Sequence, residues 1–158
     1  MEISLQLLQV FLVLIQFIFL IFGYNLTIKH FKMSKSSDFL ERFLSKEMIE
    51  SRSCVDRVFE QNDLKSALEY LYRPENIDDL NKVRSFANFF QELSIAKKMN
   101  LVSDKYVKDT FDYLVCKYWS LLSGWISDYR SKSDSTLYSK WEDLRDDFRN
   151  NNNELKKL

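Results

Sequence analysis

The chain has 158 residues, and its 23 Lys and Arg residues balance its 23 Asp and Glu residues, so the formal net charge is zero. Basic residues are mixed with acidic ones along the chain, which argues against nucleic acid as a partner. Only two Gly and one Pro residues occur, and the hairpin signals Asn-Gly and Asp-Gly are absent. The composition favours an all-α fold with one modest hydrophobic core.

Residues 3–22, ISLQLLQVFLVLIQFIFLIF, form an uncharged run of the length with which a helix crosses a bilayer. Sixteen of them are Ile, Leu, Val or Phe, and their side chains favour insertion by about 5 to 9 kcal/mol at most. Glu2 in place of a basic n-region, and the lack of a small-residue cleavage site, argue against a cleaved signal peptide. We predict a transmembrane anchor over 1–24; the alternatives are a cleaved signal peptide and a buried helix of a soluble protein.

The charges that flank the apolar run indicate its orientation. The basic residues that follow it are Lys29, His30, Lys32 and Lys35, with no acidic residue before Asp38. Positive flanks stay on the cytoplasmic side, so we predict the N-terminus outside and the rest in the cytoplasm. The basic juxtamembrane linker predicted over 25–37 sets this topology, or its lysines contact anionic lipid.

Three glutamines interrupt the apolar run. Gln9 and Gln16 are seven residues apart and share a helix face, with Gln6 one turn earlier. An amide in hydrocarbon needs a hydrogen-bond partner, which another helix can supply. The pattern predicts a homo-oligomer, or pairing with a partner's membrane helix. The alternative is that a Gln near the end reaches the interface, which fits Gln6 better than Gln16.

The domain predicted over 38–149 divides into helices by the spacing of its apolar residues. Phe39, Leu40, Phe43 and Leu44 form one apolar face, and Ser45 can cap a following helix that carries Met48, Val55, Val58 and Phe59. The later helices are expected over Leu64 to Leu71, Ile77 to Lys98, a segment after Ser103, and Thr136 to Arg149. Arg73-Pro74 is a break, and residues 150–158 are predicted to be a polar tail.

Residues 99–102 are a short connection, and Asn100 suits the left-handed conformation after a helix. Ser103 can cap the next helix, whose apolar stripe is Val107, Phe111, Leu114, Tyr118, Leu121 and Trp125. A connection this short predicts an αα-hairpin of antiparallel helices. The predicted fold is therefore a single transmembrane helix followed by a small cytoplasmic helical bundle that contains this hairpin.

The residues needed for most catalytic sites are missing. His30 is the one histidine, which excludes a Ser-His-Asp or Cys-His site within this chain. Cys54 and Cys116 are 62 residues apart, which fits small core residues of a reduced cytoplasm. No glycine-rich phosphate loop and no Glu-x-x-His metal motif occurs. We predict no catalytic residue, cofactor or metal.

Two groups of residues on the hairpin are candidates for a protein-binding surface. Arg84, Asn88 and Glu92 are spaced by four and form a polar stripe, which could also be a buried network or simple pairing within the helix. Tyr113 and Trp119 lie off the apolar stripe, where aromatic side chains serve either an interface or packing against another helix.

The hairpin also carries a recognisable set of residues. The set is Phe86-Ala87-Asn88-Phe89-Phe90-Gln91-Glu92-Leu93, Asn100-Leu101-Val102, Asp104, Tyr106-Val107, Phe111, Tyr113, Tyr118-Trp119, Leu122, Trp125-Ile126, Arg130 and, more loosely, Trp141-Glu142. With the anchor, this region resembles a family of short bacterial and phage proteins that place a domain of unknown function behind one membrane helix. That family usually has Gly at the position of Asn100 and often Pro at that of Gly124, which leaves open whether a helix boundary falls there. The resemblance implies a helical fold and an anchor but no activity.

The sequence thus predicts a membrane-anchored helical protein-interaction module, such as an anchor, scaffold or sensor subunit, with a bacterial or phage accessory or defence role. Its partners would be membrane lipid and proteins of unknown identity. The alternative is a small membrane-active effector whose transmembrane helix oligomerises and perturbs the bilayer. An enzyme with carboxylate chemistry and a secreted domain are further alternatives.

Overall fold

Six α-helices and one short 3₁₀ helix make up residues 2–155, the part of the chain that the computed structural model describes; side chains are described for residues 9–150. The elements are α1 (Glu2–Phe43), α2 (Lys46–Glu60), α3 (Leu64–Leu71), η1 (Pro74–Asn76), α4 (Ile77–Lys98), α5 (Asp104–Lys132) and α6 (Ser139–Leu155). No strand occurs among these residues. The prediction of an all-α fold with a long apolar N-terminal helix is confirmed.

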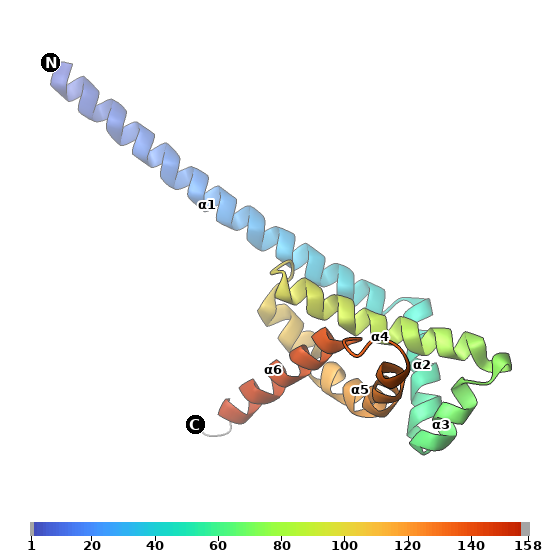
Figure 1. Ribbon diagram of the computed structural model, residues 1–158. Coiled ribbons are helices and arrows are strands. Elements are labelled where there is room, and N and C mark those ends of the chain that lie inside the picture. The colour runs from blue at the N-terminus through green and yellow to red at the C-terminus, as the bar shows by residue number, and fades with distance from the viewer. Residues whose placement is uncertain (1, 156–158) are drawn as a thin grey trace.

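Helix α1 is a single rod whose N-terminal part projects away from the other helices, while its C-terminal part packs against them (Figure 1). Its 42 residues correspond to a length of about 63 Å. The segment 25–37, predicted to be a linker, is helical throughout, because it contains neither Gly nor Pro and its Ser36 hydroxyl bonds to Lys32 O at 2.7 Å within the helix. The apolar segment is therefore continuous with the domain.

The first residues of α2 and α3 are set by side chains that cap these helices. Ser45 Oγ accepts a hydrogen bond from Met48 N at 3.3 Å, which starts α2, and Asp63 Oδ1 accepts one from Ser66 N at 2.9 Å, which starts α3. Pro74 then begins the 3₁₀ turn. Both predicted helices and the predicted break are confirmed, and α4 covers the expected residues.

Helices α4 and α5 meet at a tight turn. Asn100 has φ 58°, and Leu101 N donates to Ala96 O at 2.9 Å, as in a helix end closed by a left-handed residue. Ser103 accepts from Tyr106 N at 3.4 Å and caps α5. The two helices run antiparallel, as predicted, because Phe86 lies against Tyr118 while Phe89, nearer the turn, lies against Phe111.

Helix α6 runs parallel to α4. Tyr138 Oη donates to Asn88 Oδ1 at 3.1 Å, and the backbone N–H of Trp141 donates to Gln91 Oε1 at 3.1 Å. The helix begins at Ser139 rather than at Thr136, because Tyr138 has φ 59° and Asp134 Oδ1 accepts from Thr136 N in a turn. It continues to Leu155, so most of the predicted polar tail is helical.

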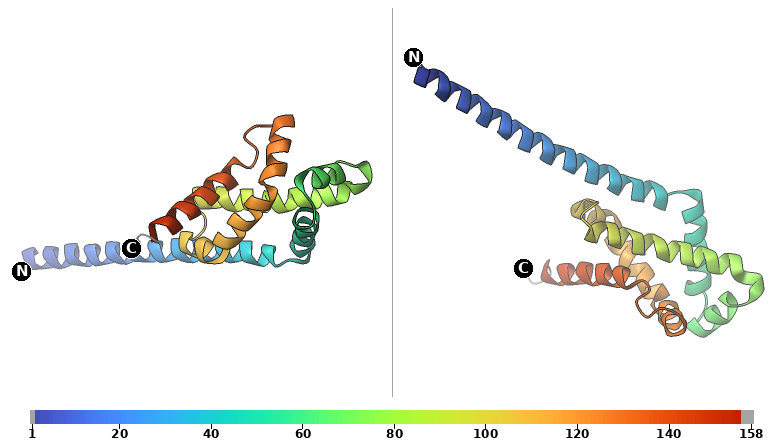
Figure 2. Two further views of the ribbon diagram at one scale, coloured as in Figure 1. Left: turned by 90° about the horizontal axis from the view of Figure 1, so that it is seen from below. Right: turned by 45° about the horizontal axis from the view of Figure 1, so that its top comes forward.

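Helices α2 to α6 gather beside the C-terminal part of α1 (Figure 2), and all six helices contribute side chains to one core. Most of its largest fully buried side chains are aromatic rings of α4, α5 and α6. The predicted stripe on α5 is too narrow: Leu114 and Leu121 are only partly buried, whereas Val115, Trp119 and Leu122 are buried. The reason is that α5 packs against α4 on one side and α6 on another. Helix α5 also continues through Gly124, so no boundary falls there.

Candidate functional site

The projecting part of α1 exposes its apolar side chains on all sides. Val10, Phe11, Leu12, Val13, Leu14, Phe17, Ile18, Phe19, Leu20, Ile21 and Phe22 are all exposed. Soluble proteins rarely leave such a contiguous apolar surface in water. By length and composition, Gln9–Phe43 contains a candidate membrane span, with a mean hydropathy of 2.2 and none of its apolar window buried. Gln9 and Gln16 are also exposed, and the Gln6 side chain lies outside the described residues.

The rod joins the domain at the turn between α4 and α5. Lys32 Nζ donates to Asn100 Oδ1 at 2.5 Å, and the buried Ser36 Oγ accepts from Ser103 N at 2.9 Å. A hollow of about 310 Å³ next to these bonds is lined from Asn25 to Met33 on α1 and from Asn100 to Asp104 on the turn. The turn is therefore held beside the segment of α1 that follows the apolar run.

The end of α1 is held a second time, in the core. Phe43 lies between Phe89 at 5.4 Å and Phe111 at 5.7 Å between ring centroids. Arg42 forms an ion pair with Glu92 and lies over the Phe89 ring at 5.6 Å. With two attachments about two turns apart on one helix, the domain has a fixed orientation relative to the rod.

We expect Ser36→Ala to lower the free energy of unfolding by about 1–3 kcal/mol, because the Ser103 N–H loses its partner in a largely buried place. Urea unfolding in detergent micelles, followed by Trp fluorescence, measures the change. Ser34→Ala, at an exposed position two residues earlier, is the matched control and should stay within about 0.5 kcal/mol of the parent protein. Equal stability of the two variants would contradict the role given to Ser36.

The polar stripe of α4 is used within the chain. Arg84 lies over the Tyr129 ring at 5.2 Å, Asn88 accepts from Tyr138 as described above, and Glu92 pairs with Arg42. Each of the three residues thus contacts a different part of the chain, and no ion pair joins Arg84 to Glu92 among the described side chains. The stripe joins α4 to α1, to α5 and to the connection before α6.

The two candidate aromatic residues have opposite environments. Trp119 is only 5% exposed, because α6 covers it: its ring lies 5.4 Å from that of Trp141 and 5.0 Å from the Arg145 guanidinium. Of the two alternatives for Trp119, packing against another helix is therefore confirmed, and Trp119 is not part of an exposed partner surface. Tyr113 is 74% exposed on α5 and stays a candidate for a contact with another protein.

A cluster that the sequence did not reveal joins α2, α3 and α4. Asp79 Oδ2 accepts from Tyr70 Oη at 2.6 Å and pairs with Arg57 Nη2 at 2.7 Å. The hydrogen bond from Tyr70 and the pairing with Arg57 lower the pKa of Asp79 to about 2. Burial, and secondarily the nearby Asp79, raise the pKa of Cys54 to about 11, so its thiol stays protonated and unreactive near neutral pH.

A family model described as domain of unknown function (DUF4760) matches residues 10–148. The chain belongs to this family. We found no curated protein and no solved structure that matches it significantly.

The family match includes both the projecting part of α1 and the helical domain. It begins at residue 10, inside the apolar run, and ends at 148, on α6. The projecting rod and the helical domain are therefore parts of one family unit, which agrees with their continuity in α1. The resemblance to a family of unknown function is confirmed, and an origin in bacteria or phage stays a prediction.

The Asp79 cluster gives the domain a defined acid sensitivity. Since the pKa of Asp79 is about 2 in the folded protein and about 3.9 in an unfolded chain, its stabilising effect is complete above about pH 4 and is lost as the pH falls toward 2. We expect the stability difference between the parent protein and Asp79→Asn to shrink over this range. Urea unfolding at pH 5, 4, 3 and 2 measures it, and a constant difference would contradict the assignment.

Proposed function

We propose that this protein is a single-pass membrane protein whose helical domain binds other proteins and performs no catalysis itself. The observation that carries the proposal is the exposed apolar rod of α1, which is continuous with a helix end packed in the domain core. A bilayer would cover the rod, and the rigid junction would set the position of the domain at its surface. A protein of this design suits the role of an anchor, scaffold or sensor subunit.

The proposed orientation has the N-terminus outside and the domain in the cytoplasm, and it rests on Lys29, Lys32 and Lys35 after the apolar run. A single added cysteine tests it. Ser133, which is exposed in the connection before α6, is changed to Cys in a Cys116→Ser background; Cys54 is buried and should not react. A membrane-impermeant maleimide should label residue 133 only after permeabilisation, and labelling of intact cells would reverse the orientation.

The hypothesis that the domain binds another protein is tested at Tyr113. A photocrosslinking amino acid placed at this exposed position of the full-length protein should yield a discrete product with a second protein in cells. The same amino acid at Tyr24, which is exposed on α1 just past the apolar run, is the matched control for contacts with lipid. Absence of any protein product from Tyr113, under conditions in which the protein is in the membrane, would count against this surface.

The effector alternative is supported by Gln9 and Gln16, which are exposed on the apolar rod and could hydrogen-bond between copies of α1. Under this alternative, Gln16→Leu should abolish membrane depolarisation by the expressed protein while the protein still inserts. Under the proposed function, the parent protein causes no depolarisation, and the variant behaves like it.

A further inference from the structure

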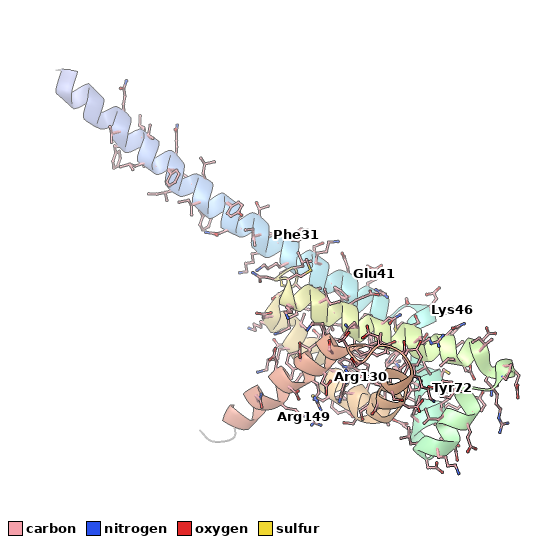
Figure 3. The ribbon with its side chains drawn as sticks, in the orientation of Figure 1. Phe31, Glu41, Lys46, Tyr72, Arg130 and Arg149 are labelled. Carbon is pink, nitrogen blue, oxygen red and sulfur yellow. The ribbon has the colours of Figure 1, made fainter. Side chains whose placement is uncertain are left out.

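The turn between α4 and α5 lies at the end of the domain that faces the projecting part of α1 (Figure 3). The α1 residues beside this turn, from Asn25 to Met33, begin three residues after Phe22, the last residue of the apolar run. At 1.5 Å per residue, they lie about 5 to 17 Å beyond the apolar run along the helix axis. The headgroup region of a leaflet is about 5–8 Å thick. If α1 spans a bilayer, the turn is therefore at or just above the headgroups.

Two basic segments lie on the side of the rod, although the formal net charge of the chain is zero and Asp143, Asp146 and Asp147 of α6 share a hollow with Lys97 and Lys98. On the side of the rod, residues 29–35 contain three lysines and no acidic residue, and residues 97–109 contain four lysines and two aspartates, Asp104 and Asp109. At the opposite end, residues 60–79 contain six acidic residues and two basic ones. Figure 3 shows Phe31 where the rod joins the domain and Tyr72, from the acidic segment, far from it.

The turn also exposes apolar side chains. Met99 is 64% exposed and Leu101 is 39% exposed, and they lie between the exposed Lys98 and Lys105. Lys97 is partly used within the chain, since its Nζ lies 3.4 Å from Asp147. Apolar residues flanked by lysines are the arrangement with which protein surfaces enter the interface of an anionic membrane.

We propose that this turn is a second membrane contact, in which Lys29, Lys98 and Lys105 bind anionic lipid headgroups while Met99 and Leu101 enter the interface. The proposal rests on the proposed insertion of α1 and names the lipid chemistry that the domain recognises. The bilayer is favoured as the occupant because α1 places the turn beside it and because the basic charge is on this side. Lys32 holds the turn in place through Asn100.

This contact would fix the tilt of the domain on the membrane. Helix α1 and the turn would then touch one leaflet at two points, while the acidic segment 60–79 would be held away from its negative surface. Exposed charges interact over about 8–10 Å at moderate salt, so lysines near the headgroups are attracted and the distant acidic segment is little affected.

The first experiment measures the depth of the turn in vesicles that contain the full-length protein. A fluorophore is attached to Met99→Cys or, as the matched control, to Ile77→Cys; both positions are exposed, Met99 directly after the last residue of α4 and Ile77 at its first. The background is Cys116→Ser, with the buried Cys54 retained. With a headgroup-labelled quencher lipid, we expect quenching at residue 99 to be at least threefold stronger than at residue 77.

The second experiment varies the charge. Vesicles of phosphatidylcholine alone are compared with vesicles that contain one third phosphatidylglycerol. Quenching at residue 99 should rise at least twofold with the anionic lipid, and the double variant Lys98→Glu/Lys105→Glu should remove this rise. Lys46→Glu/Lys65→Glu is the matched control, because these lysines are exposed at the far end of the domain. Near-UV circular dichroism verifies that each variant keeps its packed core.

Flotation of the vesicles after an alkaline carbonate wash reports the insertion of α1 separately. Protein that floats but shows equal quenching at residues 99 and 77, or no dependence on anionic lipid, overturns the inference and leaves the anchor intact. Protein that is washed off overturns both. If quenching at residue 99 still increases with anionic lipid in Lys98→Glu/Lys105→Glu, Lys98 and Lys105 do not bind the headgroups. The same conclusion follows if the control variant loses the increase equally.

Discussion

Phe90→Ala should lower the free energy of unfolding of the helical domain by about 3–5 kcal/mol. Phe90 is fully buried, stacks on Trp141 at 4.7 Å between ring centroids, and contacts rings from α1 and α5 as well. Removal of its ring leaves a cavity where four helices meet, and small domains have only about 5–15 kcal/mol of stability in total. We therefore expect a partly unfolded protein at 37 °C.

The measurement is urea unfolding of the protein in detergent micelles, with near-UV circular dichroism as the probe of aromatic packing. Tyr113→Ala is the control, because it removes a ring of similar size from an exposed position on α5 and should change stability by no more than about 0.5 kcal/mol. A loss below 1 kcal/mol for Phe90→Ala would mean that the aromatic cluster is not the centre of the core.

Helix boundaries were predictable wherever a single residue sets the local geometry. Ser45 and Ser103 accept hydrogen bonds from the backbone of the helices they start, and Asn100 adopts the left-handed conformation that ends α4. Each of these features depends on neighbours within four residues, so the sequence contains the necessary information. The start of α6 was predicted three residues early, because the left-handed Tyr138 has no such signature.

Features that depend on tertiary packing were predicted less well. Residues 25–37 were predicted to be a linker, but Ser36 is buried against Ser103, 67 residues later, and the helix continues. Trp119 lies off the predicted stripe of α5, which left open an interface or packing against another helix, and α6 covers it. In both cases the environment of the residue depends on a contact with a distant part of the chain, whose position no local pattern specifies.

The candidate site likewise combines features that the sequence shows with features that only tertiary packing creates. The apolar run and the lysines after it are visible in the sequence, because a membrane span is a matter of composition and length. The sequence does not show that the α4–α5 turn lies close to these lysines. This proximity arises from the hydrogen bonds of Lys32 to Asn100 and of Ser36 to Ser103. The Asp79 cluster was missed for a similar reason, since Arg57, Tyr70 and Asp79 come from three helices.

The rigid junction has a consequence for any signal or force that passes through this protein. Helix α1 has no break between its apolar part and its end in the core, so a rotation or tilt of the rod must move the domain with it. A flexible linker between the rod and the domain would not transmit such a motion. The design therefore suits a component whose position relative to the membrane matters for its partner.

The largest effect on location is expected from the double variant Val10→Lys/Leu14→Lys, which should leave the protein extractable by alkaline carbonate. Both positions lie near the middle of the apolar run, and each lysine there opposes insertion by about 2.5–3.5 kcal/mol. Together they offset most of the 5 to 9 kcal/mol that the apolar side chains contribute at most. Both side chains are exposed on the projecting rod, so the domain should remain folded.

Leu44→Lys/Ile49→Lys is the matched control, because it adds two lysines at exposed apolar positions where α1 ends and α2 begins, outside the proposed span. This variant should stay in the membrane pellet, and circular dichroism should show the same helix content for both variants and the parent protein. If Val10→Lys/Leu14→Lys also resists carbonate, insertion does not depend on the apolar side chains at these positions, because a lysine in the middle of a bilayer opposes insertion by about 2.5–3.5 kcal/mol. The assignment of the apolar run as the membrane span would then be wrong.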